Sequence, residues 1–189
     1  MDAFIYRIAT LGPGGSDSER AAMYFGDRLW RHEGSPVRHR EAFHGPYSGP
    51  VKIVLRDSFE ESLQEVREGG ADFGVVPAAY NNLFRLHCQY RDLDIWQAFP
   101  LPTKEMVLAQ RPGTKAVRKV ALHPTTEPLA PPGTELLYIP SKPRCVEAVI
   151  HGEADAAIGS RDVAEQHGLE VVENFGSIPM TWEVFRRRR

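Results

Sequence analysis

The sequence predicts an α/β protein of two lobes, each built on a mostly parallel sheet with helices on both faces. Three observations predict this class. Residues 58–75 recur at 141–158, apolar strand patterns alternate with amphipathic helix patterns, and 189 residues suffice for two small cores. We therefore expect one lobe from residues 1–79 with 175–189, a second lobe from 80–174, and an active site in the cleft between them.

The repeat aligns at an offset of 83 residues without a gap. Each copy combines a serine N-cap, an amphipathic helix, a glycine stop and a short buried strand. The matched positions run from Ser58, Leu63, Val66, Gly69, Ala71, Asp72 and Val75 to Ser141, Val146, Val149, Gly152, Ala154, Asp155 and Ile158. Chance similarity is the alternative, because Gly-x-Ala-Asp often follows a helix; the gap-free match favours two similar lobes.

The remaining elements follow from local patterns. A strand at 4–11, a glycine-rich turn at 12–16 and a helix at 17–32 open the chain, and a loop at 34–50 precedes a strand at 51–55. Further strands are expected at 72–76, 95–99, 106–110, 119–122, 155–158, 170–174 and 181–185. The prolines at 128, 131 and 132 exclude a long helix there.

Composition excludes several classes of function. With 23 basic and 25 acidic residues the net charge is -2, so no basic field favours nucleic acid. Residues 1–10, interrupted by Asp2 and Arg7, fit neither a secretory signal nor a membrane span, which predicts a cytoplasmic protein. Cys88 and Cys145 lack metal-ligand spacing, so we expect free thiols, no metal and no cofactor. The terminal Arg186–Arg189 run is expected to be a frayed end.

Residues that follow strands are the candidates for a site, because ligands of open α/β sheets lie at the carboxyl ends of the strands. In the first lobe the turn at 12–19 has glycines that let a backbone approach an anion, and Ser16 and Glu19 have capping-box spacing. An ordinary capped turn is the alternative. Tyr80 and Asn81 follow the strand at 72–76, where they either line a cleft or form a turn.

In the second lobe His123 and Thr125 follow the strand at 119–122, and a histidine suits proton transfer near neutral pH. A structural histidine is the alternative. Ser141 with Lys142 and Arg144 combines a helix start and two cations, which fits a carboxylate. A solvated helix start is the alternative there.

Three segments together resemble the catalytic domain of the prephenate dehydratases: TLGPGGSDSERAA at 10–22, SFEESLQEVREGGADFGVVP at 58–77, and the block at 168–185. The resemblance implies a two-lobed fold like that of type 2 periplasmic binding proteins, an active site between the lobes, and a homodimer. No ACT-type domain follows in this sequence, so feedback by phenylalanine through such a domain is not expected.

The sequence departs from that family at two motifs. Dehydratases carry Glu-Asn-Ser and Thr-Arg-Phe where this chain has Ala79-Tyr80-Asn81 and Thr181-Trp182-Glu183, so the threonine is kept and the substrate-binding arginine is lost. VVPAAYNN at 75–82, LHPTTEP at 122–128 and FGSIPMTWEVF at 175–185 resemble instead the non-aromatising prephenate decarboxylases of the bacilysin-pathway type. This implies a carbon-carbon lyase of secondary-metabolite (antibiotic) biosynthesis that converts prephenate to a dihydro-4-hydroxyphenylpyruvate.

Given the reaction that the resemblance implies, we hypothesise a role for each candidate. His123, then Tyr80, would donate the ring proton, Thr181 would orient the substrate, and Trp182 would cover apolar space beside it. The remaining candidates would bind substrate, with Lys142 or Arg111 supplying charge to the pyruvyl carboxylate: Gly14, Gly15, Ser16, Ser18, Ser58, Asn81, Arg111, Thr125, Ser141 and Lys142. A prephenate dehydratase and a non-catalytic binder of acidic metabolites are the alternatives.

Overall fold

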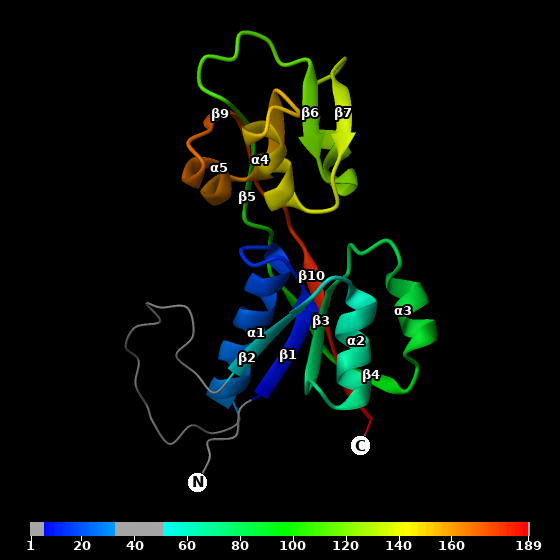
Figure 1. Cartoon of the computed structure of the whole chain (residues 1–189). Helices are drawn as coiled ribbons and strands as arrows, with labels where there is room; N and C mark the ends of the chain where they lie inside the picture. The colour runs from blue at the N-terminus through cyan, green and yellow to red at the C-terminus, as the bar shows by residue number, and fades with distance from the viewer. Residues whose placement is uncertain (1–5, 33–50, 189) are drawn as a thin grey trace. The chain divides into compact units, whose positions relative to one another are not determined.

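The computed structural model describes residues 6–32 and 51–188, so the loop expected at 34–50 lies outside the described residues. The chain divides into two compact units (Figure 1). Unit 1 comprises Met1–Leu101 with Met180–Arg189, and unit 2 comprises Pro102–Pro179. None of the helices within 6–32 and 51–188 is long and apolar enough to cross a membrane.

Unit 1 is a five-stranded sheet of order β2-β1-β3-β10-β4 with three helices. Its elements are β1 (Tyr6–Leu11), α1 (Asp17–His32), β2 (Val51–Arg56), α2 (Phe59–Glu68), β3 (Phe73–Pro77), α3 (Leu83–Gln89), β4 (Leu93–Pro100) and β10 (Thr181–Arg187). β1 is parallel to β2 and β3, whereas β10 is antiparallel to β3 and β4. The sheet is therefore mixed rather than mostly parallel, because β10 enters it from the far end of the chain.

Unit 2 repeats this arrangement with the order β7-β6-β8-β5-β9. Its elements are β5 (Glu105–Gln110), β6 (Lys119–Leu122), η1 (Pro124–Leu129), β7 (Glu135–Tyr138), α4 (Lys142–Ile150), β8 (Ala156–Ser160), α5 (Arg161–Gln166) and β9 (Glu170–Ser177). β6 is parallel to β7 and β8, and β5 is antiparallel to β8 and β9. The position of each strand thus has an equivalent in unit 1.

The predicted repeat is confirmed at the level of individual hydrogen bonds. Ser58 caps α2 by accepting from the N–H of Glu61, and Ser141 caps α4 by accepting from the N–H of Arg144. Gly69 and Gly152 both adopt positive φ, 85° and 79°, which a glycine tolerates where a helix ends.

The aspartates of the two copies also correspond. Asp72 accepts from the backbone N–H of Arg7 at 2.8 Å, and Asp155 accepts from that of Lys119 at 2.9 Å. Each carboxylate therefore ties the start of β3 or β8 to the central parallel strand of its own sheet.

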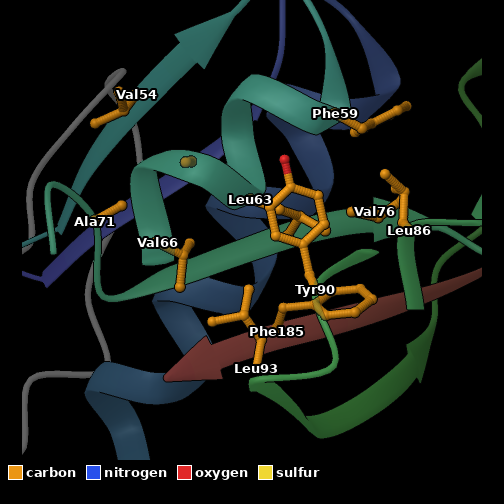
Figure 2. Packing of buried hydrophobic residues seen from close by; sticks show 11 residues of the cluster. Val54, Phe59, Leu63, Val66, Ala71, Val76, Leu86, Tyr90, Leu93 and Phe185 are labelled. Carbon is orange, nitrogen blue, oxygen red and sulfur yellow. The ribbon is translucent and has the colours of Figure 1, made fainter. Parts of the chain in front are cut away.

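The boundaries between the units differ from the expected ones. Residues 80–101 belong to unit 1, because Leu86, Tyr90 and Leu93 pack into the core beneath α2 (Figure 2). Residues 175–179 belong to unit 2, where β9 continues its pairing with β5 as far as Ser177.

Helices cover the two sheets differently. In unit 1, Ile8 packs into the cluster of α1, and its neighbour Ala9 packs into the cluster of α2, so both faces carry helices as predicted. In unit 2, α4 and α5 share one cluster with Ala121, and the other face is covered by η1 and neighbouring loop residues such as Val117. Helices on both faces were therefore a wrong expectation for unit 2.

Four short elements were not predicted: α3, η1, β7 and α5. Their lengths of 7, 6, 4 and 6 residues are too short to give a periodic pattern. The arginine run was predicted to fray, but Arg186 and Arg187 lie in β10, and Arg188 is ion-paired with Asp94 at 2.8 Å.

Candidate functional site

The carboxyl ends of parallel strands form one candidate edge in each sheet. In unit 1, the residues after β1, β2 and β3 meet at this edge, and β10 begins there because it runs antiparallel. The N–H of Gly12 donates to Arg56 at 2.8 Å, and that of Ala78 donates to the carbonyl of Thr181 at 2.8 Å. The candidates of this edge are Gly14, Gly15, Ser16, Ser18, Ser58, Tyr80, Asn81 and Thr181.

The glycine-rich turn already binds a carboxylate of its own chain. Ser16 Oγ accepts from the N–H of Glu19 at 3.2 Å, which confirms the predicted capping interaction. Glu19 Oε2 in turn accepts from the N–H of Gly15 at 2.6 Å. An external carboxylate at Gly15 would have to displace Glu19, and Ser18 is buried, so Gly14 is the more open candidate of the turn.

Tyr80 lies against the first turn of α2. Its hydroxyl is 3.2 and 3.3 Å from the two carboxylate oxygens of Glu60, and its ring packs edge-on to Phe59 with centroids 4.8 Å apart. Burial raises the pKa of Tyr80 and outweighs an opposing hydrogen bond from Asn82, and the nearby Glu60 raises that pKa further. The phenol therefore stays protonated near neutral pH and donates to Glu60.

Glu60 was missed by sequence reasoning, because an acidic residue in the first turn of a helix is explained by the helix dipole alone. Its backbone carbonyl also accepts from the Tyr90 hydroxyl at 2.7 Å. Only the tertiary packing of Tyr80 and Tyr90 on α2 identifies Glu60 as part of this edge.

Thr181 and Trp182 point to opposite sides of β10. The side chain of Thr181 is exposed at the edge, where a ligand can reach its hydroxyl. Trp182 is 1% exposed, packs with Phe25, and donates its indole N–H to the carbonyl of Leu101 at 3.0 Å. The expectation that Trp182 contacts substrate is therefore not supported within unit 1, because strand alternation turns its indole into the core.

In unit 2 the corresponding edge brings together His123, Thr125, Ser141 and Lys142. His123 Nδ1 accepts from the N–H of Thr125 at 3.3 Å and is 2.7 Å from Thr125 Oγ1. An accepting Nδ1 leaves the proton of the neutral ring on Nε2. Burial, and then the charge of Lys142, lower the pKa of His123, so the resting imidazole is neutral near pH 7.

Ser141 and Lys142 form the start of α4. Ser141 Oγ accepts from the N–H of Arg144 at 3.4 Å, so the hydroxyl serves as the predicted N-cap. Lys142 is half-buried, and its charge acts on His123. A helix start with a neighbouring ammonium suits an anion.

Arg111 is not brought together with these residues. It follows β5, which is antiparallel to β8 and therefore ends at the opposite edge of the sheet. Its Nη1 donates to the carbonyl of Val149 at 2.8 Å, in the last turn of α4. Arg111 thus caps the carboxyl end of the helix whose amino end begins at Ser141.

The remaining reactive groups offer no alternative centre. Cys145 is a buried residue of α4, and burial raises the pKa of its thiol to about 12, so it remains an unreactive thiol. Within residues 6–32 and 51–188 there is no group of three or more His, Cys, Asp and Glu side chains that could hold a metal ion. The chemistry available is that of hydroxyls and carboxylates in unit 1 and of an imidazole and an ammonium in unit 2.

Comparison with curated proteins gives relatives with one activity. A prephenate decarboxylase from Bacillus subtilis is 28% identical over 94% of this chain and 85% of its own length. A prephenate decarboxylase from Planktothrix agardhii (strain NIVA-CYA 126/8) is 24% identical over 96% of this chain and 88% of its own length. No protein-family model matches the chain.

Solved structures share the fold. Prephenate dehydratase from Arthrobacter aurescens, in complex with L-Phe, superposes with a TM-score of 0.63 at 19% identity and covers 97% of this chain. The periplasmic VFT2 domain of Bordetella pertussis BvgS superposes with a TM-score of 0.57 at 16% identity over 99% of the chain. This chain spans 61% of the length of that dehydratase and 82% of that of the VFT2 domain. At these identities the likeness defines the fold alone.

Proposed function

The chain has the α/β fold of the prephenate dehydratases, and we propose that it is a carboxy-lyase that releases carbon dioxide from prephenate. One observation carries the proposal: four curated relatives matched along the chain, at 24–28% identity, are all named prephenate decarboxylase. We further propose that the product keeps the ring hydroxyl, as a dihydro-4-hydroxyphenylpyruvate, and that the enzyme is a cytoplasmic homodimer of secondary (antibiotic) metabolism; these details extend the family resemblance.

The proposed reaction assigns roles to candidate residues in each unit. Loss of the ring carboxylate leaves an electron pair on the ring, which a proton must capture at carbon. His123 is the proposed donor. Its resting pKa is lowered by burial and Lys142, so a bound dicarboxylate that offsets this cation would raise the pKa and supply the imidazolium form.

The other roles follow from the same chemistry. Lys142 and the start of α4 would bind the pyruvyl carboxylate, which the reaction retains. Tyr80 remains the alternative donor, but its raised pKa and its hydrogen bond to Glu60 favour a role in orienting substrate together with Thr181. Gly14, Ser58, Asn81 and Thr125 would line the site.

Dehydration to phenylpyruvate is the second candidate, because the shared fold is also that of prephenate dehydratase structures. The two reactions differ in one leaving group: a dehydratase expels the ring hydroxyl together with carbon dioxide. Arginine, the cation that the resemblance gives to that family, is here replaced by Trp182, which is buried in the core.

Product analysis tests the proposal. Purified protein is incubated with prephenate beside a protein-free control, and the products are identified by NMR. A hydroxylated dihydro product is expected. Phenylpyruvate as the sole product would establish the dehydratase, and unchanged prephenate with saturable binding would establish a binding protein; either result would contradict the proposal.

A further inference from the structure

A buried carboxylate oxygen lies on the face of the unit 1 sheet that α2 covers. Glu183 is two residues beyond Thr181 on β10 and pairs with Val76 of β3. The side chains of Glu183 and Val76 therefore point to the same face of the sheet, which carries the α2 cluster. Glu183 Oε2 is buried and lies 3.0 Å from His87 Nε2 on α3. This oxygen has no hydrogen-bond partner among the described residues, so its contact with His87 is at ion-pair distance rather than an aligned hydrogen bond.

The helix that supplies His87 depends on tertiary contacts. α3 has seven residues, and its N-cap residue Asn82 makes no side-chain capping bond. Helices of this length are marginal by themselves. Leu86 and Phe185 of β10 belong to the same buried cluster (Figure 2), and the His87 ring packs on Phe185 with centroids 5.3 Å apart.

α3 also continues directly from the loop that carries Tyr80. The N–H of Tyr80 donates to Pro77 at 3.0 Å, and that of Leu83 donates to Tyr80 at 2.9 Å, so the loop is a tight turn between β3 and α3. A shift of α3 along β10 would therefore move Tyr80 relative to Thr181.

We propose that His87 and Glu183 are positioning residues, which lock α3 onto β10 and so fix the Tyr80 loop beside Thr181. This inference rests on the proposed function, because it assigns the pair a role in prephenate turnover. Neither residue contacts the reacting atoms; both act through the placement of Tyr80 and Thr181.

His87→Leu removes the ring nitrogen that lies 3.0 Å from Glu183 Oε2. We expect kcat to fall ~10-fold or more, since small misplacements in a site are costly, while KM changes less. His87→Gln keeps a side chain whose Nε2 can donate, and Glu183→Gln keeps one whose Oε1 can accept. Each of these variants should therefore retain most of the wild-type kcat. His87→Leu with Glu183→Leu should be no slower than His87→Leu alone, because the two residues act as one unit.

Arg67→Leu is the matched control. Arg67 on α2 donates to the carbonyl of Gln89 at 2.6 Å and pairs with Asp92 at 2.7 Å, so it anchors the carboxyl end of α3, two residues beyond His87. We expect it to lower the melting temperature without lowering kcat. Equal loss of kcat in Arg67→Leu and His87→Leu, or failure of His87→Gln to rescue, would overturn the proposal and leave the pair a purely structural contact.

A second readout does not depend on turnover. Amide hydrogen exchange of residues 80–83 should be faster in His87→Leu than in Arg67→Leu. If the wild type leaves prephenate unchanged, the proposed function fails. The exchange rates still show whether His87 and Glu183 hold the Tyr80 loop in place. Equal exchange of these amides in the two variants would contradict the positioning role.

Discussion

Units 1 and 2 share a framework and differ in chemistry. In the order of each sheet, three parallel strands are followed by an antiparallel fourth. An arginine at the end of that fourth strand donates to a helix carbonyl in both units: Arg187 to Val66 at 3.4 Å, and Arg111 to Val149 at 2.8 Å. The candidate edges differ. Unit 1 presents Glu60 with Tyr80, whereas unit 2 presents His123 beside Lys142.

The difference separates residues that build the fold from residues that perform chemistry. Positions that recur between the units, such as Asp72 and Asp155, hold strands and helix ends in place. Positions without an equivalent lie where the strands end. A repeat within one chain therefore serves the purpose of an alignment: shared positions such as these aspartates belong to the framework, and residues that only one copy has, such as His123 and Tyr80, are candidates for function.

The largest expected effect concerns the edge of unit 2. His123→Gln should reduce turnover of prephenate ~100-fold or more, because it removes the proposed proton donor. Steady-state kinetics with product analysis measures the loss. His151→Gln, at the exposed carboxyl end of α4, is the control and should remain active. Unimpaired turnover in His123→Gln would contradict this role and leave Tyr80 of unit 1 as the candidate proton donor.

An intermediate effect is expected from the shared framework. Asp155→Ala removes hydrogen bonds to the N–H groups of Arg118 and Lys119 and should lower the free energy of unfolding by about 1–2 kcal/mol. Asp72→Ala, which removes one such bond to Arg7, should cost less. Urea unfolding compares the two variants. A larger loss in Asp72→Ala would contradict this order, which follows from the number of hydrogen bonds removed.

The same aspartate predicts a pH dependence. The two N–H groups hold the pKa of Asp155 below its usual range. A carboxyl whose pKa is lower in the folded state stabilises the fold above its unfolded pKa of about 3.9, and this stability is lost as the pH falls through the folded value. The difference in stability between wild type and Asp155→Ala should therefore shrink below pH 4.

The smallest effect is a titration shift. Lys142→Ala removes a positive charge beside His123, so the pKa of His123 should rise toward its usual value of about 6.5 while burial still holds it lower. NMR titration of the ring protons of His123 measures this rise in pKa, with the exposed His151 as internal reference. A pKa of His123 that is unchanged in Lys142→Ala would remove the electrostatic link between these two residues.

The long elements and the repeat were predictable from the sequence, because periodicity and capping residues determine them locally. α1 and β6 have the expected bounds, and the Ser141 cap forms as expected. The candidate edge residues followed from the strand ends. Arg111, Trp182 and Glu60 could not be placed correctly, because their positions depend on strand direction in the sheet, on which side of β10 faces α1, and on tertiary packing against α2.

The insertion of β10 between β3 and β4 has a consequence for biosynthesis. Residues 102–179 are contiguous, so the sheet of unit 2 can close as soon as they have left the ribosome. The sheet of unit 1 cannot close at that stage, because its fourth strand is Thr181–Arg187. Until this strand is made, the facing backbone edges of β3 and β4 remain unpaired. The unit whose first strand is made earliest is therefore the one completed last, and a nascent chain carries an open sheet edge throughout the synthesis of the other unit.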